Sequence, residues 1–171
     1  MVSRHVAAVL VSLLAVLSVQ GQPKPEKERL KPQAPEDSMR KLVAALVEKD
    51  AWQAEQAFMS KARYTNTLPP KVPPYAQSLL RFRQSIKQFL AQPQPIEKMA
   101  FVRVSYEFCA QPMIAQKGFK GFRQMCVMYD NLHVIVRIEG ALYSFKVDSL
   151  VADDDKWALV EGIELLKPYG N

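Results

Sequence analysis

The hydrophobic pattern of the chain changes near residue 98, and this change limits the possible folds more than any other feature. Before it, apolar residues recur every three or four positions, which is typical of amphipathic helices. After it, apolar and polar residues alternate, which is typical of strands with one buried face. Helices followed by strands predict an α+β fold, with N-terminal helices packed on a curved antiparallel sheet of four to five strands.

Two helical regions are expected before the sheet. The first runs from about 38 to 61 and begins at Asp37 or Ser38 as its cap. It is either a helical pair, with Asp50 as the cap of the second helix, or one bent helix. A connection with two Pro-Pro pairs, YTNTLPPKVPPY, then excludes both helix and sheet interior. The second region, 75–91, has apolar side chains along one side only, which predicts that it packs on the sheet.

Alternation also predicts which side chains of the strands point inward. On the first two strands these are Ala100, Val102, Val104, Tyr106 and Phe108, followed by Met125, Val127 and Tyr129. On the next two strands they are Leu132, Val134, Val136 and Ile138, followed by Tyr143, Phe145 and Val147. A turn at Glu139-Gly140 joins these two strands, because glycine can adopt a positive φ. The last strand starts at Trp157 and, after an irregularity at Gly162, continues to Leu165.

The acidic stretch VADDDKW, residues 151–157, is interpreted as a turn between the last two strands. Aspartate favours turns because its side chain hydrogen-bonds to its own backbone. A calcium loop requires acids at alternate positions with a central glycine and a distant glutamate, and this stretch lacks that spacing. No other group of histidines, cysteines or acids has the spacing of a metal site, so neither a metal nor a cofactor is expected.

The N-terminal segment predicts export from the cytosol. Arg4 precedes an apolar run from Val6 to Val19, which is the layout of a signal peptide with cleavage after Gly21. The run is shorter than the roughly 20 residues that a bilayer-spanning helix needs. A cleaved signal peptide, rather than a permanent anchor, is therefore predicted.

The domain organisation follows from this segment and from the composition. A signal peptide over 1–21 precedes a leader over 22–36, which is rich in proline and charge and is expected to be disordered. Residues 37–171 then form a single α+β domain, since 49% of the chain is hydrophobic, enough for one core. Cleavage removes only Arg4, so the basic count falls from 23 to 22 against 17 acids and the net charge from +6 to about +5. These charges are mixed along the chain, which favours a solvated surface and argues against a nucleic-acid partner.

The two cysteines, Cys109 and Cys126, predict a disulfide bond. An exported protein with an even number of cysteines is typically disulfide-bonded rather than redox-active. Both residues are expected on the sheet face opposite the buried side chains, where neighbouring antiparallel strands would bring their sulfur atoms together. The alternative of two free, buried thiols stays open.

Two longer motifs lie toward the ends of the expected domain. LVAALVEKDAWQAEQAFMS predicts a helix, a "KD" break and a second helix, and VADDDKWALVEGIEL predicts a closing hairpin. This arrangement, over most of residues 38–166, resembles the nuclear transport factor 2-like superfamily of cone-shaped α+β proteins. The chain departs from that family in helix 75–91, which prolines set off, and in Asp155, which replaces the customary glycine. These departures leave a cystatin-like or other helix-on-sheet fold as an alternative.

The resemblance implies a wide range of functions. Members of the superfamily range from isomerases and hydratases to binding and assembly modules. An isomerase-like member needs a carboxylate or histidine inside the cone, beside a tyrosine or acid that stabilises an oxyanion. Tyr106, Tyr129 and Tyr143 have the inward parity and are candidates for lining such a pocket, with core packing as the alternative. His133 alternates out of phase with its apolar neighbours and is expected at the surface.

The segment QKGFKGFRQ, residues 116–124, is a second candidate site. Lys117, Lys120 and Arg123 recur at every third position, with phenylalanines between them. Basic groups interleaved with aromatic rings can hold phosphate groups or anionic lipid. The alternative is a connecting loop whose phenylalanines pack under the edge of the sheet.

Three functions are consistent with these features. The first is an exported, non-catalytic binding or protein-interaction module, whose small ligand or partner protein the sequence does not identify. The second is a small cavity enzyme of the isomerase or hydratase type, with Tyr106 or Tyr143 as polar groups. The third is a binder of anionic lipid surfaces, which makes peripheral contact with a membrane through helix 75–91 and the basic loop.

Overall fold

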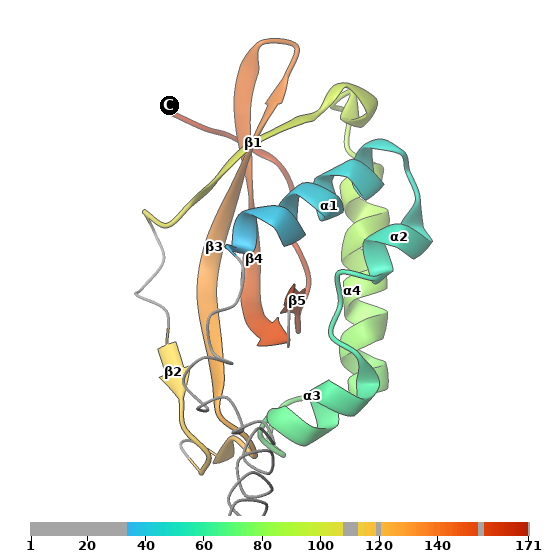
Figure 1. Ribbon diagram of the computed structural model, residues 1–171. Coiled ribbons are helices and arrows are strands. Elements are labelled where there is room, and N and C mark those ends of the chain that lie inside the picture. Colours follow the sequence, from blue (N-terminus) through green and yellow to red (C-terminus); the bar gives the residue numbers. More distant parts are fainter. Residues whose placement is uncertain (1–33, 108–112, 119–120, 154–155, 171) are drawn as a thin grey trace, which may run out of the picture.

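Helices pack on one curled antiparallel sheet, as the change of periodicity predicts (Figure 1). The computed structural model describes residues 34–107, 113–118, 121–153 and 156–170. In Figure 1, α1 crosses the inner face of the sheet and α4 runs along its side. The α+β class is therefore confirmed.

The helices of the described residues are α1 (Pro35–Val47), α2 (Ala51–Glu55), α3 (Lys61–Thr67), α4 (Tyr75–Leu90) and a 3-10 turn, η2 (Ile96–Lys98). The predicted helix 75–91 and the Asp50 cap are confirmed, since Asp50 accepts hydrogen bonds from the backbone N–H groups of Trp52 and Gln53. The predicted caps of the first helix are wrong. α1 begins at Pro35, whose ring fixes a helical φ, so the leader predicted over 22–36 ends earlier than expected.

The sequence missed α3, which lies in the stretch assigned to the proline-rich connection. Ser60 caps this helix through a hydrogen bond from the backbone N–H of Arg63, at 3.4 Å. The helix ends at Thr67, just before the first Pro-Pro pair. A segment expected to be irregular is therefore part of the helical layer.

The strands of the described residues are β1 (Ala100–Ser105), β2 (Met113–Ala115), β3 (Cys126–Ile138), β4 (Ala141–Asp153), β5 (Lys156–Leu159) and β6 (Lys167–Pro168). Their order is β1-β3-β4-β5, with short β2 on β3 and short β6 on β4. The separate strands predicted over 123–130 and 132–138 are one strand, β3, in which Asn131 adopts a positive φ of 58°. The first strand therefore pairs with the second half of β3 rather than with its beginning.

Both predicted turns of the sheet are in place. Glu139 and Gly140 have φ values of 49° and 88°, which close the β3–β4 hairpin in the left-handed conformation. Asp153 pairs with Lys156 across the β4–β5 reversal, so VADDDKW does contain a change of chain direction. Asp154 and Asp155 lie outside the described residues.

A β-bulge in β1 overturns part of the predicted alternation. The register skips Val102, since Phe101 lies opposite Val136 and Arg103 opposite the adjacent Ile135. The extra residue interrupts the alternation of side chains. The prediction that Val102 faces the core is therefore wrong, and its side chain is 36% exposed.

Four other orientation predictions are wrong. Ala100 is exposed because the bulge at Val102 shifts the alternation of side chains, so Ala100 points to the opposite face from the buried Val104. Tyr106 is 40% exposed beyond the end of β1. Leu165 is exposed and Leu166 buried, because the chain after Gly162 is irregular rather than a continuous strand. Cys126, predicted on the outer face, is buried where the start of β3 pairs with β2.

The core lies between the helices and the inner face of the β3–β4 hairpin. Leu132, Val134, Val136 and Ile138 of β3 are buried as predicted, and so are Phe145 and Val147 of β4. The ring of Phe89 on α4 packs edge-on against Phe145, with ring centroids 5.1 Å apart. The largest fully buried side chains are Met39, Leu42, Leu46, Met59, Phe82, Phe89, Ile96, Leu132, Ile135, Phe145, Leu150 and Leu159.

Candidate functional site

A cavity of about 490 Å³ lies where α3 and the start of α4 approach the sheet. Its volume is in the range of small-molecule binding sites, roughly 300 to 1,000 Å³. The wall is mainly apolar and comes from the α3–α4 connection, β2, β3 and the chain after β5. Apolar residues of this wall include Leu68, Val72, Met113, Phe122, Met128 and Val160.

The proline-rich connection forms one wall of this cavity, and Tyr64 fixes it in place. The Tyr64 hydroxyl donates to the backbone carbonyl oxygen of Pro73 at 2.9 Å and lies 2.8 Å from Ser78 Oγ. Tyr64 and Ser78 are both buried, so these polar groups are satisfied inside the protein. The connection is therefore held against the start of α4.

The loop 116–124 forms another part of the wall through Phe122. The Phe122 side chain is buried and lines the cavity. Gly121 has a φ of 88°, and a β-carbon there would lie 3.5 Å from Pro69. The backbone N–H of Gly118 donates to the carbonyl oxygen of Phe122 at 2.7 Å. The loop thus packs a phenylalanine beneath the sheet edge, as the alternative interpretation of this segment expects.

Of the three basic residues predicted to bind anions in this loop, Arg123 forms hydrogen bonds to the backbone of α3. Its guanidinium donates to the carbonyl oxygen of Thr65 at 2.9 Å, and its backbone N–H donates to that of Thr67 at 3.0 Å. Lys117 is exposed to solvent, and Lys120 lies outside the described residues. Anion binding by these three residues stays a prediction.

Three charged residues complete the cavity lining: Arg81 of α4, Asp148 of β4 and Glu161 after β5. Asp148 Oδ1 lies 2.6 Å from Lys146 Nζ, so its charge is compensated within the protein. The pKa of Glu161 is raised above its ordinary value, first because its carboxylate loses hydration and then because Asp148 and Asp130 are near.

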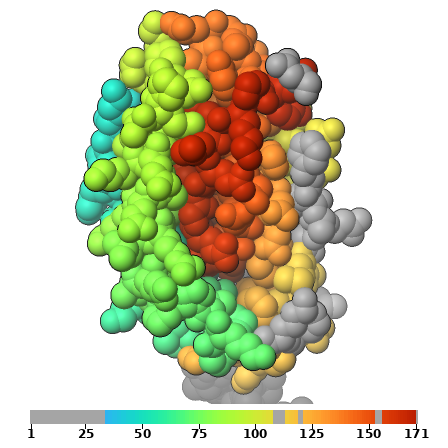
Figure 2. Space-filling view, turned by 180° about the vertical axis from the view of Figure 1, so that it is seen from behind, coloured from blue at the N-terminus to red at the C-terminus, as the bar shows by residue number. Residues whose placement is uncertain are grey.

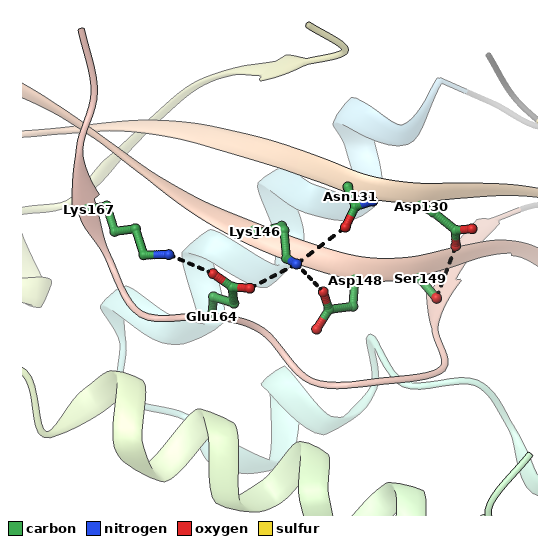
Figure 3. A network of polar contacts seen from close by, with 7 residues as sticks. All are labelled: Asp130, Asn131, Lys146, Asp148, Ser149, Glu164 and Lys167. Carbon is green, nitrogen blue, oxygen red and sulfur yellow. Dashed lines mark hydrogen bonds and ion pairs between the residues drawn. The ribbon is translucent and has the colours of Figure 1, made fainter. Parts of the chain in front are cut away.

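Lys146 is the centre of a polar network beside the cavity (Figure 3). Its ammonium group contacts Asp148, Glu164 at 2.8 Å and Asn131 at 3.3 Å, and Glu164 also contacts Lys167 at 2.9 Å. Hydrogen bonds to Asp148 and Glu164 raise the pKa of Lys146. The same contacts with Lys146 and Lys167 lower the pKa of Glu164. The network fixes the chain after β5 on β4.

The three tyrosines predicted to line a pocket do not meet in this cavity. The rings of Tyr106 and Tyr129 pack in a tilted arrangement with centroids 5.4 Å apart, and Trp157 continues the row at 5.0 Å from Tyr129. The Tyr106 hydroxyl donates to Glu36 Oε1 at 3.1 Å, so this row lies beside the start of α1. Tyr143 lies toward the other end of β4, opposite Val136. Their role as ligand-binding residues stays a prediction.

His133 and Cys126 are also outside the cavity lining. His133 lies opposite Lys146 on β4, out of phase with the buried residues of β3, and burial is the first cause that lowers its pKa. Cys126 forms no disulfide with another described residue, and burial raises the pKa of its thiol to about 11. Cys109 lies outside the described residues, so the disulfide between Cys109 and Cys126 stays a prediction.

The basic side of α4 is partly engaged within the protein. Arg83 donates two hydrogen bonds to the carboxylate of Glu55, at 2.6 and 2.7 Å. The exposed side of the helix also carries Leu80 and Lys87. Lipid binding by this helix stays a prediction.

Neither a metal cluster nor a family assignment accounts for the cavity. The described residues contain no group of three or more histidine, cysteine, aspartate or glutamate side chains suited to a metal ion. No helix within the described ranges is long and apolar enough to cross a membrane. No protein-family model, curated protein or solved structure matches the chain. The function is therefore argued from the geometry of the cavity.

Proposed function

We propose that the chain is an exported, non-catalytic binding module whose cavity between α3, α4 and the sheet takes a small amphiphilic ligand. The observation that carries this proposal is the cavity of about 490 Å³, with apolar walls and three charged residues among the described lining, Arg81, Asp148 and Glu161. Apolar walls favour the burial of a hydrocarbon group, and a few polar groups orient the ligand.

The curled sheet with helices on its inner face is compatible with a nuclear transport factor 2-like cone. We propose that family for the domain, on the element order and on the two motifs at its ends. The fold by itself does not decide between binding and catalysis. The choice depends on the chemistry of the cavity lining.

One observation favours a cavity enzyme of the isomerase or hydratase type as the second candidate. The raised pKa of Glu161 is of the kind found in catalytic acids and bases. However, Glu161 is exposed, Asp148 is paired with Lys146, and neither Tyr106 nor Tyr143 lines the cavity. A binding module needs only the apolar walls and a charged edge, and both are present.

Adjacent residues of β2 provide a matched test of the binding proposal. Met113 lines the cavity, whereas Ile114 is 60% exposed on the other face of the same strand. Met113→Trp should fill the cavity and weaken binding of the neutral fluorescent probe N-phenyl-1-naphthylamine at least about tenfold, a loss of about 1.4 kcal/mol. Ile114→Trp, which adds the same side chain outside the cavity, should leave the affinity unchanged.

The measurement is a fluorescence titration of the three proteins, each first shown to be folded by circular dichroism. Saturable binding that only Met113→Trp weakens supports the cavity as the site. Equal binding by all three proteins, or no binding by the unsubstituted chain, contradicts the proposal.

A further inference from the structure

The cavity lining carries two opposite charges, Arg81 and Glu161, that make no hydrogen bond or ion pair with another described residue. The two charges act on each other only through space. The third charged residue, Asp148, differs because Lys146 lies 2.6 Å away. A ligand in the cavity therefore meets one available cation and one available anion.

The two segments that carry these charges are joined by a hydrogen bond. In Figure 2, α4 and the chain after β5 lie side by side. Ser85, one turn along α4 from Arg81, accepts a hydrogen bond from the backbone N–H of Ile163 at 3.2 Å. A β-carbon at Gly162 would lie only 3.0 Å from Ser85 Oγ, so the two segments are in direct contact next to Glu161. The backbones that present Arg81 and Glu161 are thus held in a fixed arrangement.

Given the proposed binding function, on which this inference rests, we infer that the ligand is a zwitterionic amphiphile. Its apolar part lies against the cavity wall, its anionic group contacts Arg81 and its cationic group contacts Glu161. A guanidinium binds carboxylate or phosphate oxygens through two parallel hydrogen bonds, and a carboxylate attracts an ammonium group. A ligand with a single charge would partly desolvate both protein charges but give a hydrogen-bonding partner to only one of them.

The surroundings of Glu161 agree with this assignment. Asp148 and Asp130 lie near its carboxylate, and together with lost hydration they raise its pKa. The cations that act in the opposite direction are Arg81 and Lys146. A cationic ligand group next to Glu161 would relieve the repulsion among these acids.

Four probes with alkyl chains of seven or eight carbons test the inference by isothermal titration calorimetry at low salt. They are octylphosphocholine, which is zwitterionic, octyltrimethylammonium, octanoate and neutral octanol. The unsubstituted chain should bind octylphosphocholine at least about tenfold more tightly than each of the other three. Equal affinities, or weaker binding of the zwitterion, would overturn the inference.

Single substitutions then test which protein charge contacts which charged group of the ligand. Arg81→Gln should weaken octylphosphocholine and octanoate several-fold and leave octyltrimethylammonium unchanged. Glu161→Gln should weaken octylphosphocholine and octyltrimethylammonium and leave octanoate unchanged. Arg83→Gln is the matched control, since Arg83 is paired with Glu55 and does not line the cavity, and it should change none of the affinities.

The results separate this inference from the proposed function. If all four probes bind alike and both variants behave like the unsubstituted chain, the cavity binds amphiphiles but does not discriminate charge, and only the inference fails. If neither these probes nor N-phenyl-1-naphthylamine bind, the binding function itself fails, and the inference fails with it.

Discussion

At Tyr64, one hydroxyl group joins the proline-rich connection to α4. It donates to the Pro73 carbonyl oxygen and hydrogen-bonds with Ser78 Oγ. Tyr64→Phe removes that group and leaves the buried Ser78 hydroxyl and the half-buried Pro73 carbonyl without this partner, so the free energy of unfolding should fall by about 1–3 kcal/mol. Urea unfolding, followed by the fluorescence of the buried Trp157, measures the change.

Tyr75 supplies the control for this prediction. Its ring packs against Tyr64, with centroids 5.5 Å apart, but its hydroxyl makes no hydrogen bond with another described residue. Tyr75→Phe should therefore change the free energy of unfolding by less than about 0.5 kcal/mol. Equal losses in the two variants would show that the Tyr64 hydrogen bonds do not stabilise the cavity wall.

At the scale of elements, the sequence predicted the helices and strands in which apolar residues recur at one regular spacing. α4 and the β3–β4 hairpin are of this kind, since long amphipathic patterns and the Gly140 turn are local signals. α3 was missed because it is short and is held by tertiary contacts, such as those from Arg123. The bulge at Val102 was missed because one inserted residue leaves the apparent alternation intact.

Glu164 shows how a side chain fastens the irregular edge segment after β5. Its backbone N–H donates to the carbonyl oxygen of Lys146 at 2.9 Å, and its carboxylate contacts Lys146 and Lys167. Because these contacts lower the pKa of Glu164, they stabilise the fold above its ordinary pKa of 4.5, and this contribution is lost as pH falls through the lower pKa of the folded state.

The unsubstituted protein should therefore lose more stability than Glu164→Gln as the pH falls from about 5 to 3. The difference should be about 1 kcal/mol or less, because Glu164 is partly exposed and solvent screens the pair. Urea unfolding at a series of pH values measures it. Glu48 is an exposed carboxylate with no ion pair to a described residue, so Glu48→Gln should lose as much stability over this pH range as the unsubstituted protein does. A Glu164→Gln curve parallel to that of the unsubstituted protein would contradict the account.

At the scale of the whole molecule, the candidate site was not predictable from the sequence. The cavity wall comes from the α3–α4 connection, a loop, β2, β3, β4 and the chain after β5, so no short stretch contains it. Alternation indicates which face of a strand is buried, but it does not indicate where a curled sheet leaves space. The alternation of side chains therefore predicted Tyr106, Tyr129 and Tyr143 as pocket residues. Among the described residues, the tyrosine that lines the cavity is Tyr64, in a segment interpreted as a connection.

The central claim is that this cavity binds an amphiphile, and the methionines offer the most direct test. Met113 and Met128 line the cavity, whereas Met39 and Met59 are fully buried elsewhere in the core. The measurement is an NMR titration of the ¹³C-labelled methionine methyl groups with octylphosphocholine. The account predicts saturable shifts of the Met113 and Met128 signals with those of Met39 and Met59 unchanged. Unchanged Met113 and Met128 signals, or equal shifts at all four methionines, would contradict it.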